Sequence, residues 1–192
     1  MIFFIVSFSV MSLYTLIFVE GVTENFKAQP ISFVLPVLAL LAIANVPRLV
    51  SKKKYMYPAE LVAPMSRELT ENGFTGLTSP EAVTSAIENM EGTALVVVNS
   101  VCGCAAANAR PGARMAAMNE KKPDHLFTVF AGVDGEATEK VREFLLPYPP
   151  SSPAIALFKD GKLVHFLERH HIEGRSAGLI AENLKEAFNS FC

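Results

Sequence analysis

The sequence lacks the features that mark several large functional classes. Its 17 Lys and Arg residues are balanced by 19 Asp and Glu residues, which leaves a formal net charge of −2. No overall positive field is therefore present to attract nucleic acid. The chain also contains no Walker phosphate-binding loop, no Gly-rich dinucleotide motif and no pair of carboxylates placed for acid–base catalysis. We therefore expect neither a nucleic-acid-binding protein nor a nucleotide-dependent enzyme.

Cysteine is scarce as well, and its placement is informative. The chain has three cysteines, which is an odd number and too few for a disulfide scaffold. Cys102 and Cys104 are separated by one residue, without the second Cys or His pair that a four-ligand structural zinc site needs. We therefore expect redox chemistry and no bound metal. The third cysteine, Cys192, is predicted to be an exposed thiol near the end of a helix, without a catalytic role.

The elements around the two close cysteines predict a reactive thiol. Residues 93–98 are apolar and rich in Val, which is typical of a buried strand, and the Ala-rich stretch to Met118 is typical of a helix. Cys102 and Cys104 therefore lie where a strand passes into a helix N-terminus. Unpaired backbone N–H groups and the helix dipole favour negative charge there. Such sites lower the pKa of a cysteine from about 8.5 to roughly 3.5–7.5.

Residues 1–55 differ in composition from the rest of the chain. Residues 2–19 carry no charge and have the length of a membrane-spanning helix, and a second uncharged run follows at 31–46. The basic residues at 48–54 mark the cytoplasmic side of a membrane. These segments predict two transmembrane helices with both ends in the cytoplasm. The alternative is that Met56 is the true start and that the preceding residues are translated upstream sequence, and both interpretations stay open.

Residues 56–192 are predicted to form one α/β domain. Helical stripes and short apolar strands alternate in the order α-α-β-α-β-α-β-β-α, which predicts a mixed central sheet with helices on both faces. The Asp-Gly pair at 160–161 predicts a hairpin turn between the last two strands. Pro111 and Gly112 predict a bend in the helix that follows the cysteines. The strands are expected at 93–99, 126–130, 154–158 and 163–167.

Several segments together resemble known proteins. A strand that ends in two cysteines, followed by a helix and by an X-Pro pair before an Asp-Gly hairpin, is similar to the thioredoxin fold. More specific matches are Val97–Ala106, Arg110-Pro111, Thr128–Gly132, Pro150–Pro153, Arg169-His170, Ile172–Gly174 and Cys192. These segments resemble the bacilliredoxin family, which is otherwise soluble and cytoplasmic. The resemblance covers about residues 57–192, and the apolar extension departs from it.

The resemblance implies a thioredoxin-like three-layer fold and a thiol–disulfide oxidoreductase. This enzyme would remove bacillithiol, a low-molecular-weight thiol, from mixed disulfides with client proteins. Cys102 would be the nucleophile, and Cys104 or a second bacillithiol would resolve the intermediate. Gly103 would ease the backbone into the small Cys-Gly-Cys ring, and Pro153 would follow a cis peptide bond. The expected partners are bacillithiol as co-substrate and bacillithiolated clients in the cytoplasm, with no bound cofactor.

Substrate contacts are expected at Gly103 within the cysteine motif and at residues close to it. Ser152 and Pro153 lie in the loop before the hairpin, and Arg169 and His170 follow its last strand. Bacillithiol carries carboxylates, which a guanidinium binds well through its two-pronged geometry, although a solvated turn is the other interpretation of these residues. Two other functions stay open. One is a protein disulfide isomerase or oxidase that acts without bacillithiol, and the other is a non-catalytic thiol- or metal-binding module that would survive replacement of Cys102.

Overall fold

The structure, a computed structural model, describes residues 57–192. The candidate membrane segments at 2–19 and 31–46 lie outside these residues. Within 57–192, no helix has both the length and the hydropathy that a membrane crossing needs. The helices are α3 (Ala59–Thr70), α4 (Pro80–Ile87), the π-helix η3 (Ala105–Ala109), α5 (Arg110–Ala117), α6 (Gly135–Phe144), α7 (Arg169–Ile172) and α8 (Ala177–Phe191). The strands are β1 (Thr75–Gly76), β2 (Thr93–Asn99), β3 (His125–Phe130), β4 (Ala154–Lys159) and β5 (Lys162–Leu167).

The strands of this part of the chain form one mixed sheet in the order β1-β3-β2-β4-β5. β3 runs parallel to both β1 and β2, whereas β4 is antiparallel to β2 and to β5. β2 therefore lies in the middle of the sheet and carries the two cysteines beyond its end. The predicted mixed sheet, with its terminal hairpin of β4 and β5, is confirmed.

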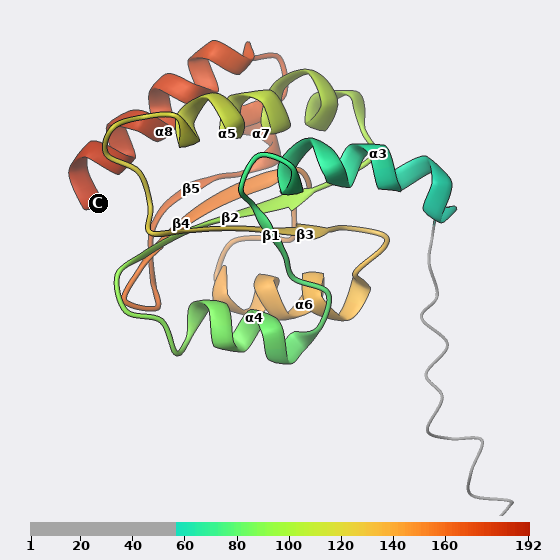
Figure 1. Ribbon diagram of the computed structural model, residues 1–192, viewed down its shortest axis with the longest axis horizontal. Helices are drawn as coiled ribbons and strands as arrows, with labels where there is room; N and C mark the ends of the chain where they lie inside the picture. Colours follow the sequence, from blue (N-terminus) through green and yellow to red (C-terminus); the bar gives the residue numbers. More distant parts are fainter. Residues whose placement is uncertain (1–56) are drawn as a thin grey trace, which may run out of the picture. The chain divides into compact units, whose positions relative to one another are not determined.

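Helices cover both faces of the sheet, as Figure 1 shows. α3, α5 and α8 pack on one face, and α4 and α6 pack on the other. β2 is buried over its whole length, and its successive side chains point to opposite faces. Leu95 and Val97 join the core under α5 and α8, while Val96 and Val98 join the core above α4 and α6. The predicted three-layer arrangement is confirmed.

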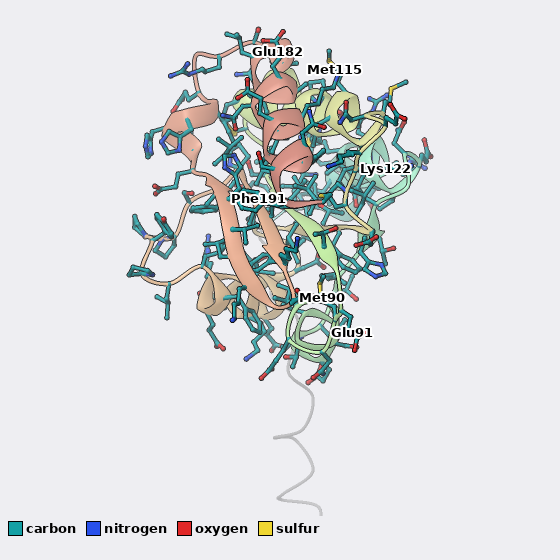
Figure 2. The ribbon with its side chains drawn as sticks, turned by 90° about the vertical axis from the view of Figure 1, so that its left-hand side faces the viewer. Met90, Glu91, Met115, Lys122, Glu182 and Phe191 are labelled. Carbon is teal, nitrogen blue, oxygen red and sulfur yellow. A yellow bond between two sulfur atoms is a disulfide. The ribbon has the colours of Figure 1, made fainter. Side chains whose placement is uncertain are left out.

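Small residues let α5 and α8 approach each other closely. Ala113 is fully buried between them. A Cβ atom on Gly112 would lie only 2.8 Å from Cγ2 of Ile180. Figure 2 shows Met115 of α5 and Glu182 of α8 on the outer side of this helical layer. The Ala-rich composition of the helix after the cysteines thus serves close helix packing.

Two short elements were not predicted. β1 pairs only Thr75 with Phe127 and Gly76 with Thr128, at the edge of the sheet. α7 is a single helical turn held by a capping box at Glu168, where the sequence predicted no helix and a solvated turn was one of two interpretations. Both elements are too short to give a periodic pattern, so hydrophobic periodicity could not reveal them.

The helix changes type directly before Pro111 and Gly112, where the sequence predicts a bend. In η3 the N–H of Arg110 donates to the carbonyl of Ala105, five residues earlier, and α5 continues from Arg110 without a break. This wider turn lies directly before Pro111, which has no N–H to continue the α-helical pattern. Single π-turns of this kind occur often at functional sites.

Candidate active site

Cys102 and Cys104 form a disulfide just beyond the end of β2. Their Cα atoms lie 5.5 Å apart, within the usual range for a disulfide. The N–H groups of Ala105 and Ala106 both donate to the carbonyl of Cys102, at 3.1 and 3.2 Å, so the helix begins directly after this residue. The motif therefore lies at the strand-to-helix junction that the sequence predicts.

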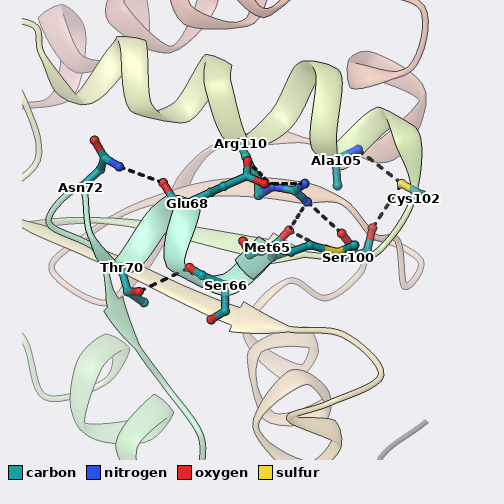
Figure 3. Close-up of polar contacts among 10 residues, drawn as sticks. Met65, Ser66, Glu68, Thr70, Asn72, Ser100, Cys102, Ala105 and Arg110 are labelled. Atoms are coloured by element: carbon teal, nitrogen blue, oxygen red, sulfur yellow. Dashed lines mark hydrogen bonds and ion pairs between the residues drawn. The ribbon is translucent and has the colours of Figure 1, made fainter. Parts of the chain in front are cut away.

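The sulfur of Cys102 has two polar neighbours, which Figure 3 shows. The N–H of Ala105 donates to Cys102 Sγ at 3.3 Å, and the hydroxyl oxygen of Ser100 lies 3.2 Å from the same sulfur. The side chain of Cys102 is partly exposed, so a substrate can reach it. Once the disulfide is reduced, these two groups and the helix N-terminus can stabilise a thiolate at Cys102.

A buried cation supports the loop that carries Cys102 (Figure 3). The side chain of Arg110 is only 2% exposed, and its Nε and Nη2 donate to the carboxylate of Glu68 at 2.8 and 3.1 Å. Its Nη1 donates to Asn99 Oδ1 at 3.2 Å and to the carbonyl of Ser100 at 3.1 Å. Asn99 Oδ1 also accepts the N–H of Ser100 at 2.8 Å. Arg110 therefore joins α3 to the two residues that lead into the motif.

Sequence reasoning assigned no role to Arg110, although a signal was present. Arg110 lies three residues before Ala113, which faces the core, so helical spacing puts Arg110 on the flank of the buried face. A charged residue is rarely buried unless it is paired. The position therefore predicts a buried partner, but the sequence does not identify Glu68 as that partner.

A cavity of about 380 Å³ opens beside Cys102. Two of the predicted contact residues, Ser152 and Arg169, line it together with Cys102. Arg169 Nη1 donates to the carbonyl of Ser152 at 3.3 Å, and the N–H of Arg169 donates to the hydroxyl of Ser151 at 3.4 Å. The Ser152–Pro153 peptide bond is cis, which confirms the prediction, and a second cis bond precedes Pro147. Thus α7 is tied to the loop before β4 at the cavity.

α6 supplies a polar wall of this cavity that was not predicted. Thr138, Glu139 and Arg142 all line it. Arg142 Nη1 donates to Glu139 Oε1 at 2.6 Å. Thr138 is only 2% exposed, and neither its hydroxyl nor Arg142 Nε has a hydrogen-bond partner among the residues that the structure describes. The cavity therefore has donors available on the side away from α7.

Other predicted contact residues are not brought to the cavity. Its lining does not include the predicted contact residues Gly103, Pro153 and His170, nor does it include the predicted resolving cysteine, Cys104. Gly103 was expected to ease ring closure, but its φ is not positive and a Cβ atom there would meet no other atom within 4 Å. The backbone of the motif therefore does not require glycine at this position.

His170 belongs to a separate group on α7. Its side chain, with those of Glu168 and His171, brings possible metal-ligand atoms within 4.8 Å of one another. Glu168 and His171 already cap α7, since the Glu168 N–H donates to His171 Nδ1 at 3.2 Å and the Glu168 carboxylate accepts the His171 N–H. Two of these three side chains therefore already serve to stabilise α7.

Cys192 lies far from the motif along β2. Its thiol interacts with Thr93 at the beginning of β2, and burial raises the pKa of this thiol above its usual value. Cys102 follows the other end of the same strand. Because β2 has seven residues, the two sites are separated by about 20 Å. Cys192 therefore cannot reach an intermediate on Cys102 in the same chain.

Comparison with known proteins identifies similar sequences. A family model described as "Disulphide isomerase" matches residues 57–192. The chain is 63% identical over 134 residues to a bacilliredoxin of Cytophaga hutchinsonii, in a match that covers 70% of this chain and 98% of that protein. It is 54% identical over 136 residues to a bacilliredoxin of Halalkalibacterium halodurans, covering 71% and 94% of the two chains. A bacilliredoxin of Salinibacter ruber is 51% identical over 138 residues, covering 71% and 81%.

Solved structures were compared as well. "A putative oxidoreductase with a thioredoxin fold" is 17% identical, with a TM-score of 0.47, and the match covers 58% of this chain and 96% of that one. The oxidised thioredoxin of Plasmodium falciparum is 20% identical, with a TM-score of 0.44, and the match covers 62% and 97%.

Proposed function

This chain belongs to the bacilliredoxin family and is accordingly a thiol–disulfide oxidoreductase, and we propose that it releases bacillithiol from mixed disulfides with client proteins. The observation that carries this proposal is the Cys102–Cys104 pair at the helix N-terminus, with a cavity open beside Cys102. The co-substrate is bacillithiol, the clients are bacillithiolated proteins, and no resident cofactor takes part. The reaction belongs in the cytoplasm, and residues 2–46 are candidates for an anchor on the inner face of the membrane.

The first step is an attack by the Cys102 thiolate. Its sulfur bonds to the bacillithiol sulfur of the mixed disulfide, the original S–S bond breaks, and the client leaves as a thiolate. The N–H of Ala105 and the hydroxyl of Ser100 lie next to the attacking sulfur and support its negative charge. Cys102 now carries bacillithiol, and the client is restored.

The second step removes bacillithiol from Cys102. The Cys104 thiolate attacks Cys102 Sγ, bacillithiol leaves as a thiolate, and the Cys102–Cys104 disulfide forms. The Cα separation of 5.5 Å supports this ring closure. Two further bacillithiol molecules can then reduce the disulfide to two thiols and leave as bacillithiol disulfide. A second bacillithiol can also resolve the adduct on Cys102 directly, and Cys104 is then not used.

Three single variants test this scheme on a client protein that carries bacillithiol. Cys102→Ser should release no bacillithiol, because it lacks the attacking sulfur. Cys104→Ser should release the client once and accumulate an adduct on Cys102, which mass spectrometry detects as added mass. Cys192→Ser is the matched control and should behave as the wild type. Full activity of Cys102→Ser would refute the proposal and would favour the non-catalytic thiol- or metal-binding module.

Disulfide isomerase or oxidase activity is the second candidate, because the matching family model carries the description "Disulphide isomerase". The same cysteine pair could form or exchange disulfides in a client protein. The two functions differ in their need for the small thiol. Reactivation of a client with scrambled disulfides, in the absence of bacillithiol, would favour the isomerase. A strict requirement for bacillithiol on the client favours the primary proposal.

A further inference from the structure

We propose that the cavity beside Cys102 recognises a carboxylate of the substrate through Arg142 and Thr138 of α6. This inference rests on the proposed function, because it names the chemical group that the same site selects. The carboxylate is the one carried by the small thiol, and its binding places that thiol's sulfur against Cys102. Arg142 and Thr138 are thus residues that set specificity, and they do not touch the reacting sulfurs.

One face of α6 is turned toward the cavity. Gly135, Thr138, Glu139 and Arg142 follow each other at spacings of three, one and three residues, so they share one side of the helix, and all four line the cavity. The adjoining side, which includes Ala137 and Val141, packs in the core below the sheet. A polar helix face normally meets bulk water, whereas this one lines a cavity beside the nucleophile Cys102.

Two donors on this face lack acceptors. Thr138 is 2% exposed and its hydroxyl has no partner, and Arg142 Nε is shielded from solvent and also has none among the described residues. A buried polar group without a hydrogen bond is costly and uncommon. Arg142 Nε can only donate and the Thr138 hydroxyl can donate, so a ligand with acceptor oxygens satisfies both groups. A carboxylate has two such oxygens and matches a guanidinium in charge and geometry.

Two guanidinium groups and one carboxylate line the cavity. Arg142 lies on the α6 wall, and Arg169 lies on the wall formed by α7 and the loop before β4. Glu139 is the carboxylate in the lining, and Arg142 Nη1 already engages it. Arg169 in turn pairs with Glu173, which lies outside the lining, at 3.3 Å. Both guanidinium groups thus have a carboxylate partner, and the preference for an anion rests on the two unpartnered donors, Arg142 Nε and the Thr138 hydroxyl. The volume of about 380 Å³ is that of a site for a small ligand.

A substrate carboxylate could come from the small thiol or from an acidic residue of the client. The reaction itself favours the small thiol, because the first step leaves it bonded to Cys102, next to the cavity. A client residue would have to enter the same cavity while the client is leaving. Peptide substrates can separate the two sources.

The experiment uses four peptides, each with one modified cysteine. The cysteine is flanked by Asp or by Asn, and it carries either bacillithiol, which has carboxylates, or 2-mercaptoethanol, which has none. The full chain is assayed as the wild type, Arg142→Gln, Thr138→Val and Lys140→Gln. Lys140→Gln is the matched control, because it removes one positive charge from α6 at a residue outside the cavity lining.

We expect Arg142→Gln to lower kcat/KM for both bacillithiol peptides by about tenfold, mostly through KM, because a charge-assisted hydrogen bond is lost. The two 2-mercaptoethanol peptides should be turned over as by the wild type. Thr138→Val should lower kcat/KM for bacillithiol peptides several-fold while its urea midpoint stays the same or rises, because the hydroxyl has no partner to lose. Lys140→Gln should change none of these values by more than about twofold.

Other outcomes overturn the inference. Equal effects of Arg142→Gln on all four peptides, or an effect no larger than that of Lys140→Gln, would show that no carboxylate is recognised there. If Arg142→Gln lowers kcat/KM only for the peptides with Asp beside the cysteine and not for those with Asn, the site binds a carboxylate of the client. That result would refute the assignment to the small thiol. Failure of the proposed function looks different, since the wild type would then not turn over the two bacillithiol peptides.

Discussion

Removing the charge of Glu68 should destabilise the protein far more than removing a surface charge. Arg110 is 2% exposed, and Glu68 is its counter-ion at 2.8 Å. Breaking a buried ion pair from one side costs about 3–5 kcal/mol, because the other charge stays buried without a partner. Glu68 is 38% exposed, so water recovers part of this loss. We therefore expect Glu68→Gln to lower the free energy of unfolding by about 2–3 kcal/mol.

Arg110→Met should lower the free energy of unfolding by a similar amount for a different reason. It removes the donor to the buried carbonyl of Ser100, and an unsatisfied buried acceptor costs about 1–3 kcal/mol. Asn99 Oδ1 keeps the N–H of Ser100 as a partner, so it loses less. In the double variant no charge is stranded. Its loss should therefore be about 2 kcal/mol smaller than the sum of the two single losses.

Urea unfolding of the full chain measures these differences. A loss of about 2–3 kcal/mol corresponds to a midpoint lower by about 1–2 M at the slopes usual for small domains. Glu143→Gln is the control, because its pair with Lys140 is exposed and should be worth less than about 1 kcal/mol. If Glu68→Gln shifts the midpoint no more than this control does, the buried pair does not hold the loop.

The same variants should alter the reactivity of Cys102. Arg110 fixes the carbonyl of Ser100, and the hydroxyl of Ser100 lies 3.2 Å from Cys102 Sγ. With that loop loosened, the reduced Arg110→Met protein should react more slowly with iodoacetamide at Cys102 than the wild type. Glu143→Gln should react as the wild type does. An unchanged rate in Arg110→Met would limit Arg110 to a role in stability.

Further predictions concern other parts of the fold. Gly112→Ala should lower the free energy of unfolding in urea by about 1–3 kcal/mol, because the new Cβ would lie 2.8 Å from Ile180 Cγ2. The control is Gly178→Ala, whose Cβ would meet only one atom, at 3.8 Å, and it should not lower this free energy. The Thr93 N–H and hydroxyl hold the pKa of Asp124 below its ordinary value of 3.8. The resulting stabilisation is complete above that value and is lost as the pH falls through the lowered pKa, so Asp124→Asn should flatten the decline of the urea midpoint below about pH 4. Burial raises the pKa of Cys192, so at pH 7 this thiol should be alkylated more slowly than a cysteine in a free peptide, as mass spectrometry can follow.

The centre of the fold could be predicted because its signals are local in the sequence. Residues 93–99 are Val-rich and continuous, and β2 is buried at every position. The Asp-Gly turn at 160–161 joins β4 to β5, with Gly161 at a φ of 74° that favours glycine. The position of the cysteines follows from these neighbours. The strand-to-helix junction at Cys102 was therefore accessible from the sequence.

Elements that depend on one or two contacts could not be predicted. β1 is a strand only because two residues pair with β3 at the sheet edge. α7 is held by the contacts of Glu168 with His171. In the sequence, these residues look like those of an ordinary polar turn. The π-turn before Pro111 depends on a backbone hydrogen bond from Arg110 to Ala105. None of these features has a periodic pattern for the sequence to show.

The surroundings of the polar face of α6 could not be predicted from the sequence. Helical spacing predicts that Thr138, Glu139 and Arg142 share one side of α6, next to the buried side with Ala137 and Val141. It does not state what that side faces, and solvent is the ordinary expectation for such residues. Here the end of β2 brings Cys102 to the same space, and the loop before β4 closes it with Ser152. The chemistry of the site thus arises from the sheet order, which places residues far apart in the chain around one sulfur.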